Sequence, residues 1–185
     1  MNCQAQSSVS IFEKTIHKIL KYNAIQRKST VFGGNHWKIE EVLDGDSIII
    51  RHRCTQKTKE IRLYGLDAPE IKYSRKMKED ELKSQLPAQI LIQFGLQALH
   101  YVLSVAPPGT TVTIITEKDY YLDYWHRQLG YVILPDGNCL NDLLLTNGYA
   151  RATHEYYCSR LAQLQLLNRE AQLQKKGIYS LVNRF

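Results

Sequence analysis

Cysteine patterns that would mark a zinc site or a disulfide framework are missing from this chain. The four cysteines are Cys3, Cys54, Cys139 and Cys158. None forms a C-x-x-C pair, and none lies near a histidine at zinc-finger spacing. The pattern favours free, mostly buried thiols in a reducing compartment, while the even count leaves disulfides in a secreted protein open.

Long hydrophobic runs are also lacking. The longest candidate, residues 90–106, is interrupted by Gln93, Gln97 and His100, so the sequence predicts no transmembrane segment. No secretory signal is visible either, because no lysine or arginine precedes residue 11 and the segment 11–22 is broken by charged residues. A cytoplasmic location is the resulting expectation, with secretion left open.

Overall composition is that of a folded, basic protein. Hydrophobic residues make up 44% of the 185 residues and charged residues 23%, a mixture that suits one globular domain with a modest extension. The net charge is +6 and the pI is about 9.1, which favours a polyanionic partner. Basic charge alone does not establish nucleic-acid binding, because many basic proteins bind none.

The N-terminal part, residues 1–35, differs from the rest and is predicted to be an extension. Ser10 and Glu13 have capping-box spacing, and a short amphipathic helix is predicted over residues 11–22. This helix could pack on the domain, and a membrane or partner role stays open. A break at residues 33–35 then precedes the predicted domain, residues 36–181.

Within the domain, five short strands are predicted from period-two alternation and β-branched residues. They cover residues 37–42, 47–52, 59–64, 111–116 and 129–134. Gly45 marks a sharp turn between the first two strands. Five strands interrupted by one helix fit an α+β domain built on a five-stranded Greek-key barrel, the oligonucleotide-binding (OB) fold.

About three core helices are predicted. One covers residues 90–106 and ends at Pro107, because proline cannot continue it. A short second helix is capped by Asn141 and ends near Gly148. The third covers residues 159–176. The charged stretch between the third strand and the first helix is predicted to be part of a long loop, which carries Lys72, Arg75, Lys76 and Lys78.

Three clusters of acidic and basic residues lie at the ends of predicted strands. They are Asp44-Gly-Asp46-Ser47, Arg62-Leu-Tyr-Gly-Leu-Asp67-Ala-Pro-Glu70, and Asp123-Tyr-Trp-His-Arg127. Carboxylates without sulfur or imidazole favour a hard cation such as calcium or magnesium. Arginine suits phosphate, and Glu70 could activate a water molecule. Each cluster alone is more often a turn or a solvated surface, but together they indicate phosphoryl-transfer chemistry.

The combination resembles the staphylococcal nuclease (thermonuclease) family. The resemblance continues in Leu129-Gly-Tyr-Val132, Asp136-Gly137, Asn141-Asp-Leu-Leu, Asn147-Gly-Tyr-Ala150 and Lys176-Gly-Ile-Tyr-Ser180. It covers residues 37–180, nearly the whole body of the chain.

The resemblance implies a role for each matching residue. Asp46, Asp67 and the backbone carbonyl of Ala68 would bind one calcium ion, with Asp44 supporting them. Arg62, Glu70 and Arg127 would be catalytic, and the family leaves 3′-phosphorylated products from DNA or RNA. Because clustered carboxylates repel one another, removal of Asp46 is expected to weaken calcium binding and to stabilise the metal-free protein slightly.

The surroundings of the predicted site depart from the family pattern. Tyr124 and His154 replace residues that can reach substrate, while Trp125 and Tyr156 keep aromatic rings there. All four are predicted substrate contacts, and base stacking on Trp125 and Tyr156 competes with simple packing on the barrel edge.

Three functions remain open at this point. The first is a calcium-dependent nuclease that acts as a monomer on single-stranded DNA or RNA. The second is a catalytically inactive nucleic-acid or protein-binding module with a nuclease-like fold. The third is an unrelated small binding protein, which would make all three clusters coincidental. Retention of Arg62, Asp67, Glu70 and Arg127 favours the enzyme.

Overall fold

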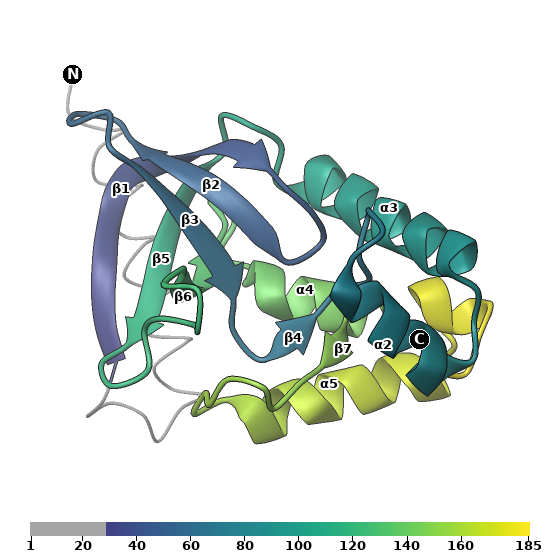
Figure 1. The fold of residues 1–185 in the computed structure, drawn as a ribbon. Helices are drawn as coiled ribbons and strands as arrows, with labels where there is room; N and C mark the ends of the chain where they lie inside the picture. Colours follow the sequence, from purple (N-terminus) through teal and green to yellow (C-terminus); the bar gives the residue numbers. More distant parts are fainter. Residues whose placement is uncertain (1–28) are drawn as a thin grey trace.

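The computed structural model describes residues 29–185, and its centre is a closed five-stranded barrel (Figure 1). The strands are β1 (Ser29–Val42), β2 (Ser47–His52), β3 (Thr58–Leu63), β5 (Thr111–Glu117) and β6 (Gln128–Ile133). They follow the order β1-β2-β3-β6-β5, and β3 and β6 are parallel while the other neighbours are antiparallel. The predicted α+β barrel is therefore confirmed.

The first strand is longer than predicted. Ser29 already pairs with Glu117 of β5, and a register shift between Phe32 and Trp37 falls at the predicted break. The strand continues because β5 offers backbone partners on both sides of the shift. The boundary of the extension stays a prediction, and the predicted helix over residues 11–22 lies outside the described residues.

Aliphatic side chains from all five strands fill the barrel. Representative members with at most 1% exposure are Ile39, Ile48, Ile50, Ile61, Ile114 and Leu129. Burying each such side chain contributes about 1.5–3 kcal/mol before the entropy of folding is counted. The strand alternation that predicted these elements is thus the pattern of residues facing the core.

Three core helices cover the barrel, as predicted: α3 (Ala88–Val105), α4 (Leu140–Thr146) and α5 (Leu161–Leu173). A single-turn 3₁₀ helix follows at Gly177–Ser180. Within the described residues, α3 alone has the length and composition to cross a membrane, contrary to the expectation that no run is long enough. It buries Leu91, Phe94, Ala98 and Val102, which is the arrangement of a core helix.

A fourth helix, α2 (Arg75–Ser84), occupies the stretch predicted as a loop. Ser74 begins it, and its Oγ accepts a hydrogen bond from the Met77 backbone N–H at 3.1 Å. Met77, Asp80 and Ser84 are buried at a helical spacing of three and four residues. Hydrophobic periodicity did not predict this helix, because two of the three residues on its buried face are polar.

Asn141 does not cap α4 as predicted. Cys139 occupies the N-cap position without a side-chain bond, and Asn141 lies inside the helix with no exposure. Its amide accepts from the Val132 N–H at 3.1 Å and donates to the carbonyls of Tyr64 and Gly130 at 3.1 and 3.3 Å. Asn141 therefore ties α4 to β6 and to the segment that follows β3.

The cysteines within the described residues are free, as expected. Cys139 and Cys158 are buried and Cys54 is exposed. Burial raises the pKa of Cys139 to about 12 and that of Cys158 to about 11, so both stay protonated and unreactive at neutral pH.

Candidate active site

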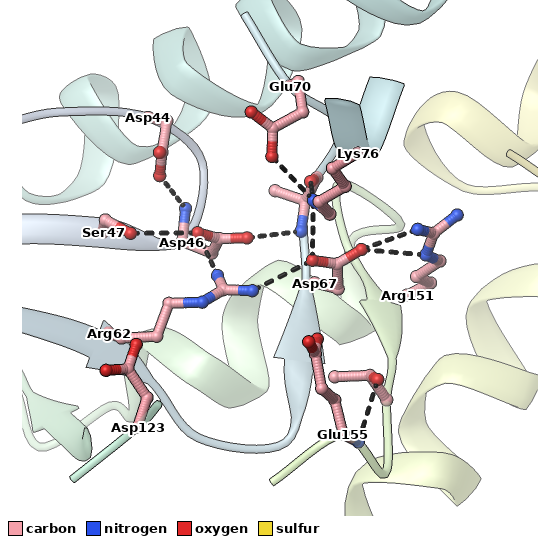
Figure 2. Close-up of polar contacts among 12 residues, drawn as sticks. Asp44, Asp46, Ser47, Arg62, Asp67, Glu70, Lys76, Asp123, Arg151 and Glu155 are labelled. Carbon is pink, nitrogen blue, oxygen red and sulfur yellow. Dashed lines mark hydrogen bonds and ion pairs between the residues drawn. The ribbon is translucent and has the colours of Figure 1, made fainter. Parts of the chain in front are cut away.

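An open cleft of about 470 Å³ gathers most of the predicted site residues. The lining residues are Asp44, Asp46, Arg62, Asp67, Glu70, Ser74, Arg75, Lys76, Trp125, Arg127, Glu155 and Tyr156. They come from the β1–β2 turn, the end of β3, the short strand β4 (Leu66–Asp67), the segment between β4 and α2, α2 itself, the loop before β6, and the segment after β7 (Arg151–Ala152). Figure 2 shows the polar contacts at its centre.

Two glycines let helix α3 hold the acidic loops together. A Cβ on Gly45 would lie 2.6 Å from the Cβ of Ala68 and 2.7 Å from that of Ala98. A Cβ on Gly95 would lie 2.5 Å from the carbonyl oxygen of Glu70. Since Cβ atoms do not approach this closely, any larger residue would push the β1–β2 turn or the segment after β4 away from α3.

Asp46 joins two of the predicted clusters. It is 6% exposed, and its Oδ2 accepts the backbone N–H of Ala68 at 2.7 Å. Its Oδ1 accepts the Ser47 hydroxyl at 3.1 Å. Asp44 caps the same turn, since its Oδ1 accepts the Asp46 N–H at 2.9 Å. The cluster at the β1–β2 turn is thereby fixed against the cluster that follows β3.

Arg62 lies between the two central aspartates (Figure 2). The guanidinium is 4% exposed; Nη1 contacts Asp46 Oδ1, and Nη2 lies 2.9 Å from Asp67 Oδ1. A buried guanidinium is tolerated when carboxylates compensate its lost hydration, and here both neighbours do so. Arg62 therefore has two roles: it neutralises the buried acids, and it lines the cleft.

Sequence reasoning missed Arg151, which holds the other side of Asp67. These two residues face each other in the β4–β7 ladder, and Arg151 Nε and Nη2 lie 3.1 and 2.7 Å from Asp67 Oδ2. Nη2 also lies 2.5 Å from Asp80 Oδ1 of α2. Arg151 directly follows the family-like motif that ends at Ala150, so its position next to that motif was the available signal.

Lys76 of α2 is the second residue that sequence reasoning did not place. Its ammonium lies 2.8 Å from Asp67 Oδ1, 2.9 Å from Glu70 Oε1 and 3.2 Å from the carbonyl oxygen of Ala68. In the sequence, Lys76 is one of several basic residues in a charged stretch, and nothing local distinguishes it from Lys72, Arg75 or Lys78. In the structure it contacts three of the oxygen-bearing residues of the predicted site.

These cations change the protonation of the acids. Burial alone would raise the pKa of Asp67, but Lys76, Arg62 and Arg151 outweigh it and lower that pKa to about 2. Burial raises the pKa of Asp44, opposed only in part by Arg62. Burial would lower the pKa of Lys76, yet Asp67 and Glu70 raise it. Asp67 and Lys76 are therefore fully charged at neutral pH.

Arg127 stands on the wall of the cleft at the end of a tight loop. Asp123 Oδ1 accepts the backbone N–H groups of Trp125 and Arg127 at 2.9 and 2.8 Å, and its Oδ2 lies 2.7 Å from Arg127 Nε. Arg127 Nη1 is 3.4 Å from Ser47 Oγ and 3.5 Å from Glu60 Oε1. The side chain keeps 25% exposure, so its guanidinium is held in place yet accessible from the cleft.

The four predicted substrate contacts divide into two pairs. Trp125 and Tyr156 line the cleft, and the Arg127 guanidinium lies 5.4 Å from the centre of the Trp125 ring. Tyr124 is 85% exposed and His154 is exposed, and neither is among the lining residues. Contact of Tyr124 or His154 with substrate stays a prediction.

The oxygen atoms around Lys76 are of the kind that binds calcium. Two carboxylates and one backbone carbonyl converge on a single ammonium, and such hard oxygen donors suit calcium or magnesium. Within residues 29–185, no three acidic, histidine or cysteine side chains gather closely enough to hold a metal by themselves. The donor set fits a divalent cation only when the main-chain oxygen of Ala68 is included.

Comparison with known proteins agrees with this geometry. Residues 60–181 match the model of the family described as staphylococcal nuclease homologue. "Endonuclease YhcR" of Bacillus subtilis (strain 168) is 33% identical over 112 residues, which are 60% of this chain and 8% of that protein. An "uncharacterized endonuclease" of Escherichia coli O157:H7 is 29% identical over 145 residues, 78% of this chain and 77% of that protein. The chain belongs to the staphylococcal nuclease family.

Proposed function

We propose that this protein is a calcium-dependent endonuclease of the thermonuclease type, which hydrolyses phosphodiester bonds of DNA or RNA and leaves 3′-phosphorylated products. The observation that carries the proposal is the convergence of Asp46, Asp67, Glu70, Arg62 and Arg127 on one open cleft. Relatives named as endonucleases support the reaction class. All five residues belong to one chain, which supports action as a monomer.

The metal would be held by Asp46, Asp67 and the carbonyl oxygen of Ala68, with Asp44 supporting the turn through its bond to the Asp46 N–H. When bound, a divalent cation polarises the phosphate oxygens and offsets the charge that grows on them. The remaining chemistry is assigned to side chains of this protein.

Arg127 is the accessible phosphate ligand. Its orientation is set by Asp123 while its outer nitrogens remain at the cleft, so the guanidinium requires little reorganisation when the phosphate becomes more negative. Arg62, which lies between Asp46 and Asp67, supplies a second positive charge. Trp125 and Tyr156 offer aromatic surfaces to the bases on either side of the scissile phosphate.

Glu70 is the proposed base. Its carboxylate, in the cleft lining, would take a proton from a water molecule whose oxygen attacks phosphorus. A bond from water oxygen to phosphorus forms while the bond from phosphorus to the 5′ oxygen breaks. The departing 5′ oxygen takes up a proton from solvent, and the phosphate stays on the 3′ oxygen.

The test uses purified full-length protein with end-labelled single-stranded DNA and RNA, in calcium and then in chelator. We expect internal cleavage that requires calcium and is lost in Glu70→Gln. The products should become substrates for 3′ extension only after phosphatase treatment. Binding of the oligonucleotides without cleavage, in calcium and in other divalent cations, would instead favour the inactive binding module.

A further inference from the structure

We infer that Lys76 is a tethered cation that occupies the position of the divalent metal ion and must leave before the metal can bind. The inference rests on the proposed function, because it concerns the metal that this function requires. Lys76 belongs to α2 and is not one of the predicted site residues, yet it would compete with the metal for its ligands.

Lys76 has more oxygen partners than an ordinary ion pair provides. An ammonium group has three N–H donors, and those of Lys76 reach Asp67, Glu70 and the backbone carbonyl of Ala68 at 2.8–3.2 Å (Figure 2). A surface lysine that forms an ordinary ion pair needs one carboxylate. Lys76 instead engages two of the proposed metal-ligand residues, Asp67 and Ala68, together with the proposed base.

Helix α2 holds Lys76 over the acids. The helix begins at the Ser74 cap, and Met77 next to Lys76 is completely buried. Asp80, one turn further along, is bound to Arg151, which is itself bound to Asp67. The backbone of Lys76 is therefore anchored, while its side chain stays 34% exposed.

The Lys76 ammonium and a divalent metal ion exclude each other from this site. A divalent ion bound to Asp67 and the Ala68 carbonyl would fall where the Lys76 ammonium now lies, and two cations cannot occupy one position. Arg62 and Arg151 already lie on Asp67, so a divalent charge added beside all three cations would also increase their mutual repulsion. The lysine stem is long and flexible, so its head group can swing into solvent without movement of α2. Metal binding thus exchanges one cation for another, and its apparent affinity is lowered by the free energy of removing Lys76.

The closing experiment measures calcium affinity directly by titration calorimetry, independently of cleavage. Lys76→Met removes the competing ammonium and is expected to bind calcium at least about tenfold more tightly than the unaltered protein. Lys78→Met is the matched control. Lys78 is an exposed lysine of the same helix that lies over the Tyr73 ring, so its removal changes net charge equally and should leave the affinity unchanged.

A second measurement uses the unaltered protein, in case Lys76→Met does not fold. Acylation of lysines, located by mass spectrometry, should become faster at Lys76 when calcium is added, because the displaced amine enters solvent. The acylation rate at Lys78 should stay the same. Slower or unchanged acylation at Lys76 on calcium binding would refute the exchange.

The remaining outcomes separate the two proposals. If the unaltered protein binds calcium and cleaves, but Lys76→Met binds no more tightly or no differently from Lys78→Met, the inference is wrong and the proposed function stands. If neither the unaltered protein nor Lys76→Met binds calcium, the calcium dependence in the proposed function and the inference both fail.

Discussion

The centre and the wall of the cleft use the same chemical group in two ways. At the centre, Arg62 is 4% exposed and lies between Asp46 and Asp67. On the wall, Arg127 keeps 25% exposure and is bound mainly to Asp123, whose other contacts are backbone N–H groups of the same loop. Both arginines are proposed to be catalytic and both neutralise buried acids, but Arg62 is itself buried and lies between two of them, whereas Arg127 is partly exposed and pairs with one, Asp123.

Because of this difference in burial, loss of activity and loss of stability should separate along the cleft. Removing a buried charge leaves its partners unpaired in a region of low polarity, which destabilises the fold. Removing Arg127, which keeps 25% exposure, leaves one buried carboxylate, and that carboxylate still accepts two backbone N–H groups. Substitutions at the centre should therefore affect folding and catalysis together, whereas substitutions on the wall should affect catalysis more than folding.

The largest effect is expected for Arg62→Met. It leaves Asp46 and one oxygen of Asp67 without their guanidinium, and it should lower the free energy of unfolding by about 3–5 kcal/mol. Urea denaturation in chelator measures this value. Arg127→Met is the matched substitution and should lose less, about 1–3 kcal/mol, because the buried Asp123 carboxylate loses its guanidinium but keeps two backbone N–H donors. Equal losses in the two variants would show that burial does not distinguish the arginines.

The next effect belongs to Arg127→Lys, which keeps the charge but loses the planar fork of donors. Cleavage should slow at least about a hundredfold, because one preorganised donor to the transition state is worth about 3–4 kcal/mol. Single-turnover rates at saturating enzyme isolate the chemical step. The unfolding midpoint should be unchanged. Arg169→Lys, on the exposed face of α5, is the control and should cleave at the normal rate. If Arg127→Lys also cleaved at the normal rate, Arg127 would not be a catalytic residue.

A smaller effect is expected for Asp46→Ala, and the structure reverses its sign in the metal-free protein. The sequence predicted relief of repulsion between acids, but Asp46 accepts the Ala68 N–H and neutralises Arg62. Its loss should destabilise the metal-free protein by about 1–3 kcal/mol and weaken calcium binding.

Thermal unfolding with and without calcium measures both consequences of Asp46→Ala. Asp119→Ala removes an exposed acid and serves as the control for net charge. A metal-free Asp46→Ala protein that is more stable than the unaltered protein would restore the repulsion argument.

The smallest effect is expected for Trp125→Ala at the outer wall. Losing one exposed stacking surface should weaken binding of single-stranded DNA by about 1 kcal/mol, or roughly fivefold. Fluorescence anisotropy in a Glu70→Gln background measures affinity without cleavage. Tyr121→Ala removes an exposed aromatic ring outside the cleft lining and should bind normally. An equal loss in both variants would extend the substrate surface beyond the cleft.

Much of the fold could be predicted because its signals are local. Alternation along each strand places every second side chain in the core, and Ser47–His52 agrees with its prediction at both ends. The helices of the core were also predicted, since Leu91, Phe94, Ala98 and Val102 recur at helical spacing. The residues of the cleft were identified by motifs that combine acids and arginines at strand ends.

By itself, then, the sequence determined the barrel, its three covering helices and the residues that line the acidic turn. Tertiary structure alone decided which cation lies on which acid. Arg151 reaches Asp67 across 84 positions of the chain, through the pairing of two short strands. Lys76 reaches the same carboxylate because a buried methionine and a serine cap turn a charged stretch into a helix. A charged side chain has the same local sequence signal whether water or a buried carboxylate surrounds it, so only the packing of distant segments selects its partner.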